Sequence, residues 1–272
     1  MAAECSATAA GDVVPQGCLL IVGGSERLDK GLRLLRTYAE LCDRVPARRD
    51  IIIVASATGH PDALGGEYYR TFGKMGWPWD GLHLPPLATR ADAADPQTAA
   101  LIAGAAGIYM TGGDQVSLVE TLRGTACGEA MRAAYMAGAV VGGTSAGATA
   151  IGDPMIARGG GSGEVKPGEL VLHPGLGLAG ANRVIDTHFG RRGRFPRLVA
   201  VVAERPGTLG IGIDENTALL VRAGGRHGLV LGTGSVYLIT SPPAEEGKVG
   251  GAFGLHLLRE GQEFDLAQEA LV

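Results

Sequence analysis

Short apolar runs alternate with helical stretches through the first half of the chain, and this alternation constrains the fold more than any other feature of the sequence. The runs are apolar almost throughout, as is typical of strands that are covered on both faces. The stretches between them carry apolar side chains at helical spacing. We therefore predict an α/β fold, a three-layer sandwich with a mostly parallel central sheet. The expected strands are 18–22, 50–55, 82–84, 107–110 and 139–141, and the expected helices are 28–41, 62–75, 95–103, 116–123 and 127–137.

The second half of the chain has one helical stretch, 195–204, and short strands separated by turns. We expect these strands to form an antiparallel C-terminal extension of the same sheet. No linker is long enough to divide the chain, so residues 17–272 are expected to form a single α/β domain behind a flexible tail, residues 1–16. The glycine-rich residues 159–168 are a candidate lid or insertion. The expected strands of this half are 184–189, 209–213, 218–221, 228–231, 235–239 and 253–258.

Composition excludes several classes of function. A net charge of −4 gives no global attraction to nucleic acid or anionic membrane. No apolar run approaches the roughly 20 residues that span a bilayer, and residues 1–17 lack the pattern of a secretory signal. The four cysteines are scattered without a C-x-x-C pair, which suits a reducing compartment, so we expect a cytoplasmic protein. The chain has no metal-ligand motif and no complete dinucleotide fingerprint, so we expect neither a metal nor a cofactor.

A G-x-S-x-G pattern follows the strand at 139–141. Gly143 and Gly147 flank Ser145, and small residues continue to Ala150. In a strand–turn–helix context this pattern exposes the serine on a strained turn, with a helix N-terminus behind it that favours negative charge. The alternative is an ordinary glycine-rich turn with an incidental serine.

Polar or glycine-rich loops follow other strands as well. They are residues 23–24, 56–60 and 111–115, in addition to 143–147. Ligands of parallel sheets bind outside the carboxyl ends of the strands, where these loops would lie. The sequence therefore predicts a site on this edge.

A nucleophilic serine needs a base and an acid that orients the base. His188 lies between Asp186 and an arginine cluster, and these charged neighbours favour His188 as the base. The alternative is a structural role, which is more common for a lone histidine. Of the other histidines, His83 and His256 lie within strand-like runs. Asp214 and Glu215 end an apolar strand and either could supply the acid; a solvated turn is the alternative.

The arginine cluster supplies four guanidinium groups within residues 191–197: Arg191, Arg192, Arg194 and Arg197. A solvated helix start or a nucleic-acid patch are alternatives. Because the protein is acidic overall and has no second basic stripe, we favour recognition of a carboxylate, which the planar guanidinium can bind with two parallel hydrogen bonds.

The sequence resembles the cyanophycinase family, serine peptidases related to aspartyl dipeptidase. The blocks that carry the resemblance occur in the order of the family and span roughly residues 18–260. They are Thr-Gly-Gly-Asp-Gln at 111–115, Gly-Gly-Thr-Ser-Ala-Gly-Ala at 142–148, Asp-Thr-His-Phe-Gly-Arg-Arg-Gly-Arg-Phe-Pro-Arg-Leu at 186–198 and Gly-Ile-Gly-Ile-Asp-Glu-Asn-Thr-Ala at 210–218.

The resemblance implies a fold like that of class I glutamine amidotransferases and a homodimer without cofactors. It implies hydrolysis of cyanophycin, a poly-aspartate with arginine on its side-chain carboxylates, to β-Asp-Arg through an acyl-enzyme. It assigns the nucleophile to Ser145, the base to His188 and the orienting acid to Glu215, and the oxyanion hole to the amides of Gly113 and Ala146. The implied substrate-binding residues are Gln115, Asp186, Thr187, Arg192, Arg194 and Arg197.

One position departs from the family. Thr187 stands where the family usually has glutamine, and the shorter side chain puts the substrate preference in question. An aspartyl or isoaspartyl dipeptidase remains an alternative, and so does a non-catalytic binding protein on the same fold. The arginine cluster favours the polymer-degrading enzyme over the dipeptidase.

Overall fold

The computed structural model describes residues 14–26, 32–160, 165, 168–241, 253–268 and 270–271. Most of the expected tail and the middle of the expected lid, including residues 161–164, lie outside this part. In the described part, no helix is both long and apolar enough to cross a membrane.

A nine-stranded sheet forms the centre of the fold, in the order β15-β14-β11-β10-β1-β5-β4-β2-β3. The half from β1 to β3 is parallel, and the half from β10 to β15 is antiparallel, which confirms the predicted mixed sheet and its extension. The parallel strands are β1 (Leu19–Val22), β5 (Val140–Thr144), β4 (Gly107–Met110), β2 (Ile51–Val54) and β3 (Leu82–His83). The antiparallel ones are β10 (Thr217–Val221), β11 (His227–Gly232), β14 (Glu263–Asp265) and β15 (Ala270–Leu271).

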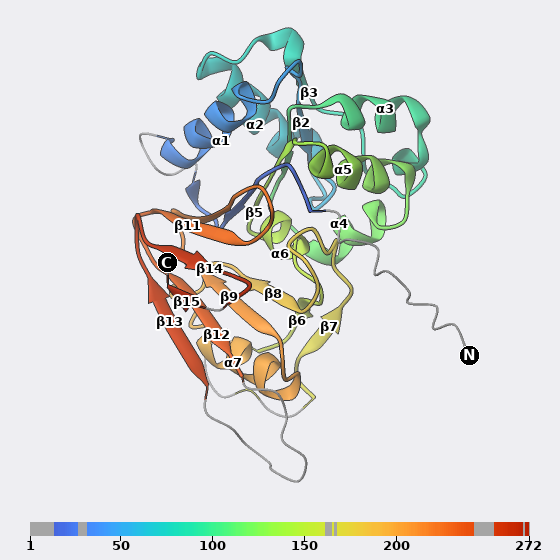
Figure 1. The fold of residues 1–272 in the computed structure, drawn as a ribbon. Helices are drawn as coiled ribbons and strands as arrows, with labels where there is room; N and C mark the ends of the chain where they lie inside the picture. The colour runs from blue at the N-terminus through green and yellow to red at the C-terminus, as the bar shows by residue number, and fades with distance from the viewer. Residues whose placement is uncertain are drawn as a thin grey trace, which may run out of the picture.

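Helices cover both faces of the parallel half (Figure 1). Along β1, Leu20 and Val22 pack with the helices of one face, and Leu19 and Ile21 with those of the other, so every residue of this strand is buried. The apolar runs of the sequence are explained by this double cover. The first face carries α1 (Arg33–Asp43) and α2 (Pro61–Lys74); the second carries α3 (Pro96–Gly104), α4 (Gln115–Leu122) and α5 (Ala126–Met136). Short 3₁₀ turns η2 (Trp79–Gly81) and η3 (Asp92–Ala94) flank β3 and α3.

Side-chain caps start three of these helices where the sequence changes from loop to helical spacing. Asp95 accepts a hydrogen bond from the amide of Thr98, Asp114 from those of Val116 and Ser117, and Thr125 from that of Gly128. Such caps satisfy amides that have no partner within the helix.

A second, four-stranded sheet, in the order β13-β12-β9-β8, lies below the parallel half of the first sheet in Figure 1. The expectation that all later strands extend the central sheet is therefore wrong for these strands. The turn at residues 214–216 carries the chain from one sheet to the other, with Asn216 at a φ of 53°. The four strands are β8 (Arg183–Asp186), β9 (Leu209–Ile213), β12 (Val236–Thr240) and β13 (Gly254–Leu258). The helix α7 (Phe195–Glu204) packs on this sheet, and the hairpin of β6 (Met155–Arg158) and β7 (Val171–His173) lies beside it.

Candidate active site

Ser145 occupies a strained turn between β5 and α6 (Ala146–Ala150), with φ 53° and ψ −114°. The flanking glycines make this turn possible because the backbone passes close to itself. A Cβ on Gly147 would lie 2.4 Å from the carbonyl oxygen of Met110, and one on Gly143 would lie 2.6 Å from the backbone of Gly147. The half-buried nucleophile candidate is thus placed at the carboxyl end of a central strand, as the pattern predicts.

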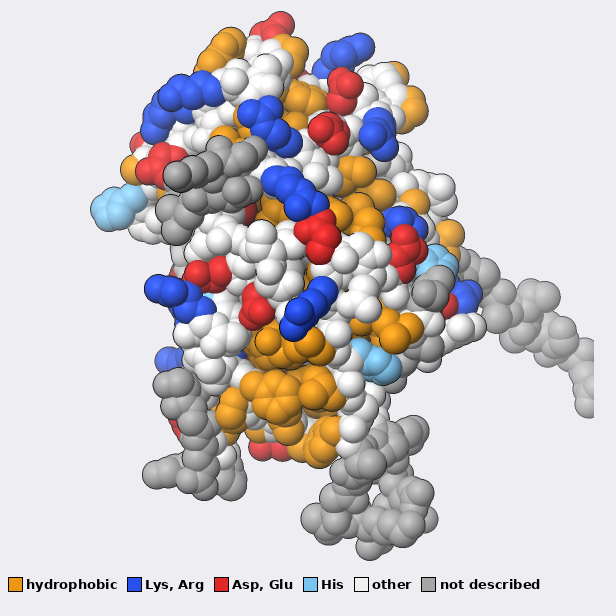
Figure 2. All heavy atoms as spheres, turned by 90° about the vertical axis from the view of Figure 1, so that its left-hand side faces the viewer, with side chains coloured by type: hydrophobic (Ala, Val, Ile, Leu, Met, Phe, Trp, Pro, Cys, Tyr) orange, Lys and Arg blue, Asp and Glu red, His pale blue; other side chains and the backbone are white. Residues whose placement is uncertain are grey.

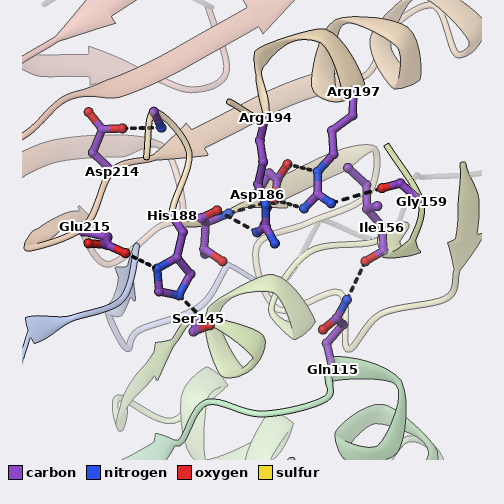
Figure 3. A network of polar contacts seen from close by, with 12 residues as sticks. Gln115, Ser145, Ile156, Gly159, Asp186, His188, Arg194, Arg197, Asp214 and Glu215 are labelled. Atoms are coloured by element: carbon purple, nitrogen blue, oxygen red, sulfur yellow. Dashed lines mark hydrogen bonds and ion pairs between the residues drawn. The ribbon is translucent and has the colours of Figure 1, made fainter. Parts of the chain in front are cut away.

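A hydrogen-bonded chain joins Ser145, His188 and Glu215 (Figure 3). The Ser145 Oγ lies 2.9 Å from His188 Nε2, and His188 Nδ1 lies 2.7 Å from Glu215 Oε1. His188 follows β8 of the second sheet, whereas Glu215 lies in the turn that joins the two sheets. With a proton on Nδ1, the imidazole donates to Glu215 and can accept the serine proton at Nε2.

Burial and neighbouring charges determine the protonation states of His188 and Glu215. Burial lowers the pKa of His188 below its ordinary value; the hydrogen bond to Glu215 opposes this, and the charges of Arg192 and Arg194 add to it. Burial acts to raise the pKa of Glu215, but the hydrogen bond and charge of His188 and the charge of Arg191 hold it lower. At neutral pH, the pair is therefore a neutral imidazole beside a carboxylate, which is the form a general base requires.

Gly113 and Ala146 carry the two backbone amides that are expected to hold an oxyanion. Gly113 has a φ of 141°, and a Cβ there would lie 1.9 Å from the Ala57 carbonyl oxygen, so only glycine fits. Its neighbour Gly112 faces the serine, because a Cβ on Gly112 would lie 3.4 Å from Ser145 Cβ. Ala146 is the first residue of α6, and its amide points out of the helix start without an intrahelical acceptor.

Asp186 and two arginines form a buried ionic cluster on the other side of His188 from Glu215 (Figure 3). Arg197 binds both carboxylate oxygens, through Nε at 2.6 Å and Nη2 at 2.5 Å, and Arg194 donates from 3.1 Å. Burial lowers the pKa of Arg194 to about 10, against the opposing charge of Asp186. The Arg194 guanidinium is therefore charged at neutral pH. The hydrogen bonds to Asp186 fix both guanidinium groups in position.

An open cavity of about 370 Å³ adjoins this cluster. Three of its six lining residues are arginines; the lining consists of Gly159, Gly160, Glu169, Arg192, Arg194 and Arg197. The structure thus brings the three expected arginines together. Asp186 is only 1% exposed and lies behind them, holding them in place instead of facing the cavity.

Two other expected substrate-binding residues are not among the cavity-lining residues. The side chain of Thr187 is buried, and its carbonyl oxygen accepts a hydrogen bond of 2.7 Å from Arg194. Gln115 begins α4, and its Nε2 donates to the carbonyls of Ile156 and Ala157 at 2.8 and 2.9 Å. Its amide hydrogens are thereby used to anchor β6, so the group that it can offer a substrate is its carbonyl oxygen, an acceptor.

Of the two acid candidates that end β9, the structure brings Glu215 to the imidazole. Asp214 instead accepts hydrogen bonds from the amides of Gly190 at 2.8 Å and Ser235 at 3.1 Å, and so fixes the loop that follows His188. Among the other histidines, His83 pairs with Asp50 at 2.9 Å.

Sequence reasoning missed Ser25, whose hydroxyl donates to Glu215. Ser25 follows the glycine pair 23–24, which the sequence places among the loops at the carboxyl ends of the strands. Within the described residues, no three His, Cys, Asp or Glu side chains gather as metal ligands would.

Comparison with known proteins agrees with this geometry. The family described as Peptidase family S51 matches residues 19–228. A cyanophycinase of Trichormus variabilis (strain ATCC 29413 / PCC 7937) is 36% identical over 267 residues, spanning 93% of this chain and 87% of the relative. A cyanophycinase of Synechococcus elongatus is 36% identical over 227 residues, spanning 82% of this chain and 68% of the relative. The fold is also that of a peptidase from an acI-B1 Actinobacterium, whose crystal structure aligns with a TM-score of 0.71 at 22% identity and covers 93% of this chain and 98% of its own.

Proposed function

The chain belongs to peptidase family S51 and is a serine-type peptidase, and from this premise we propose that it degrades cyanophycin to β-Asp-Arg. The observation that carries the proposal is the hydrogen-bonded chain from Ser145 through His188 to Glu215, at 2.9 and 2.7 Å. The three residues of this triad come from the central sheet, the second sheet and the turn between the two sheets. This arrangement supports the proposal that residues 17–272 act as one catalytic domain.

In the proposed reaction, Ser145 Oγ attacks the main-chain carbonyl carbon of a β-aspartyl unit while the serine proton moves to His188 Nε2. Negative charge on the carbonyl oxygen is stabilised by the amides of Gly113 and Ala146. His188 then gives its proton to the leaving amine, the C–N bond breaks, and an ester to Ser145 remains. Water attacks this ester with His188 again as base, which frees the acid and restores the serine. Glu215 keeps the imidazole oriented and stabilises its cationic form.

The arginine-lined cavity supports a substrate of this class. Each arginine of cyanophycin is attached through its amine, so it presents a free carboxylate beside its own guanidinium. Arg192, Arg194 and Arg197 offer planar donors for that carboxylate, while Glu169 puts an acid on the same wall. The free acceptor oxygen of Gln115 suits an N–H group of the substrate. Thr187 would act through the position of Arg194, which binds its carbonyl oxygen.

The test is to incubate the protein with purified cyanophycin and to measure β-Asp-Arg by mass spectrometry. We expect release by the wild type and, for Ser145→Ala, a rate lowered by about 10⁶ or more. Ser117→Ala on α4 is a matched control, because its hydroxyl is exposed and lies outside the site. Release of dipeptide at the wild-type rate by Ser145→Ala would contradict the mechanism. Cleavage of free β-aspartyl dipeptides without cleavage of the polymer would point to a dipeptidase.

We further propose a cytoplasmic homodimer. The described cysteines, Cys18, Cys42 and Cys127, are free thiols, which suits a reducing compartment. Apolar side chains gather on the face that Figure 2 shows, and on and beside β13 three of them are exposed by 43–52%: Phe253, Leu255 and Leu257. Light scattering after gel filtration would measure the dimer, and Leu255→Asp is expected to shift it towards monomer. A monomeric wild type at micromolar concentration would refute the dimer without touching the catalytic proposal.

A further inference from the structure

Residues 22–26, which are the last residue of β1 and the loop after it, contact all three residues of the hydrogen-bonded catalytic triad. Three successive carbonyl oxygens accept backbone hydrogen bonds: Val22 from Ser145 at 3.1 Å, Gly23 from His188 at 2.8 Å, and Gly24 from Asn216 at 2.8 Å. Asn216 directly follows Glu215. One short loop thereby fixes the backbone beside the nucleophile, the base and the orienting acid, which come from three different places in the chain.

The loop also packs directly against the imidazole. Gly24 has a φ of 105°, and a Cβ there would lie 2.3 Å from His188 Cε1 and 2.6 Å from Nε2. The hydroxyl of Ser25 donates to Glu215. His188 itself has a φ of 50°, an unfavourable conformation for a side-chain-bearing residue that surrounding contacts must maintain. A small movement of this loop would therefore move the base relative to the serine.

Glu26 ends the loop as a carboxylate that is only 2% exposed. Its Oε1 accepts hydrogen bonds from the hydroxyls of Tyr68 at 2.5 Å and Tyr109 at 3.1 Å. Its Oε2 accepts one from the hydroxyl of Thr144 at 2.7 Å. Tyr68 comes from α2 and Tyr109 from β4, so the carboxylate joins a covering helix and a central strand to the residue before the nucleophile.

We propose that Glu26 is a positioning residue for the reaction: through the Thr144 hydroxyl it holds the loop 22–26 in register with the turn that carries Ser145. This inference rests on the proposed serine mechanism. Burying a carboxylate is costly unless its oxygens are well bonded. The network does not touch the cavity, so its loss acts on the Ser145–His188 geometry, whereas the arginines that face the substrate stay in place.

This role predicts a split between kinetic constants. Misplacement by about 1 Å can lower the rate of a reaction about 10²-fold without a change in ground-state binding. Loss of the Glu26–Thr144 bond is therefore expected to lower kcat by about 10- to 100-fold and to leave KM within about twofold. A carboxylate that only stabilised the core would lower the free energy of unfolding and leave kcat of the folded enzyme unchanged.

The experiment alters the bond from either end. Thr144→Val deletes the donor hydroxyl with little change in volume. Glu26→Gln deletes the charge and replaces one of the two acceptor oxygens by an NH₂ donor, which weakens the bonds from the three hydroxyls. Thr121→Val is the matched control, since Thr121 is likewise buried but lies on α4 outside the network. Thr144→Ser restores a hydroxyl and is expected to recover most of the rate lost in Thr144→Val. If Glu26→Gln fails to fold, Thr144→Val still tests the bond, because it buries no new charge.

Two readouts are needed: kcat and KM on cyanophycin, and the rate at which a fluorophosphonate probe labels Ser145. The probe reports nucleophile geometry whatever the natural substrate is. We expect both substitutions to slow labelling at least tenfold, and the double variant to be no slower than the slower single variant. Labelling within twofold of the wild type in both single variants, or additive losses in the double variant, would overturn the role of Glu26. A wild type that the probe does not label would overturn the serine mechanism itself, and this inference with it.

Discussion

Replacing Asp186 by asparagine tests whether a buried carboxylate holds Arg194 and Arg197 in position at the proposed substrate cavity. The carboxylate accepts hydrogen bonds from Arg197 through two nitrogens, from Arg194, and from the amide of Thr187 at 2.9 Å. Asparagine has nearly the same shape, but it carries no charge, and its NH₂ group cannot accept. It would face arginine N–H groups with a donor, and leave two guanidinium groups without a counter-charge.

The structure sets the size of the effect. Breaking a buried ion pair by removing one partner costs about 3–5 kcal/mol. The side chain of Asp186 is 1% exposed, whereas those of Arg197 and Arg194 are 10% and 17% exposed and border an open cavity. Water can therefore solvate the arginines in part once the carboxylate is neutral, which favours the lower end. We expect Asp186→Asn to lower the free energy of unfolding by about 3 kcal/mol, roughly a hundredfold in the equilibrium between folded and unfolded protein.

Urea unfolding followed by circular dichroism measures this loss, and Glu204→Gln, an exposed carboxylate at the end of α7, is the control with an expected change within about 0.5 kcal/mol. In the folded variant KM should rise, because the guanidinium groups lose their fixed positions, while probe labelling of Ser145 stays near the wild-type rate. Unfolding of Asp186→Asn at the wild-type urea concentration, with an unchanged KM, would refute the reasoning.

Three further substitutions test other parts of the site. Glu215→Gln keeps the shape but cannot fix the Nδ1 proton on His188, so kcat should fall by about 10³–10⁴; a loss below tenfold would contradict its orienting role. Arg192→Gln removes a charge that lowers the pKa of His188, so the acidic limb of the kcat/KM profile should move to higher pH; Arg70→Gln on α2 should leave the limb in place, and an unmoved limb in both would reject the coupling. Gly147→Ala would bring a Cβ to 2.4 Å from the Met110 carbonyl oxygen and should cost about 1–3 kcal/mol in urea unfolding, whereas Gly104→Ala, with open space around it, should change stability little. Equal stability of the two variants would contradict the close packing of the turn that carries Ser145.

Local pattern was sufficient for the parallel half of the fold. The runs around Leu19–Val22 and Ile51–Val54 are apolar throughout because both of their faces are covered, and this uninterrupted apolar pattern is visible within the segment itself. The same holds for the helix at Phe195–Glu204 and for the strand at Leu209–Ile213, whose bounds follow from spacing and turn residues. The need for Gly143 in the serine turn was equally local, since a Cβ there would meet the backbone of Gly147, four residues away. The need for Gly147 was not local, because a Cβ there would meet the carbonyl oxygen of Met110 at the end of β4.

Pairing between strands was not a local property. Strands β9 and β10 are consecutive in the chain and similar in composition, yet β9 pairs with β8 and β12, and β10 with β1 and β11. Alternation of apolar residues indicates that a strand has one buried face, but the pattern does not predict which strand pairs with it. The second sheet therefore had no signature in the sequence apart from the turn at 214–216.

The chemical groups available to the site are visible in the sequence alone: a serine on a glycine-flanked turn, a histidine beside an arginine cluster, and a pair of acids at a strand end. The family resemblance assigned roles to some of these groups. How the groups contact one another follows from the folded arrangement. In the folded protein, Glu215 hydrogen-bonds to the imidazole, whereas Asp214 hydrogen-bonds to the Gly190 amide. Asp186 lies behind the arginines, and Glu26 accepts a hydrogen bond from Thr144. The physical reason is that a hydrogen bond depends on distance and direction, and these are set by the packing of segments as far apart in the chain as residues 26 and 144.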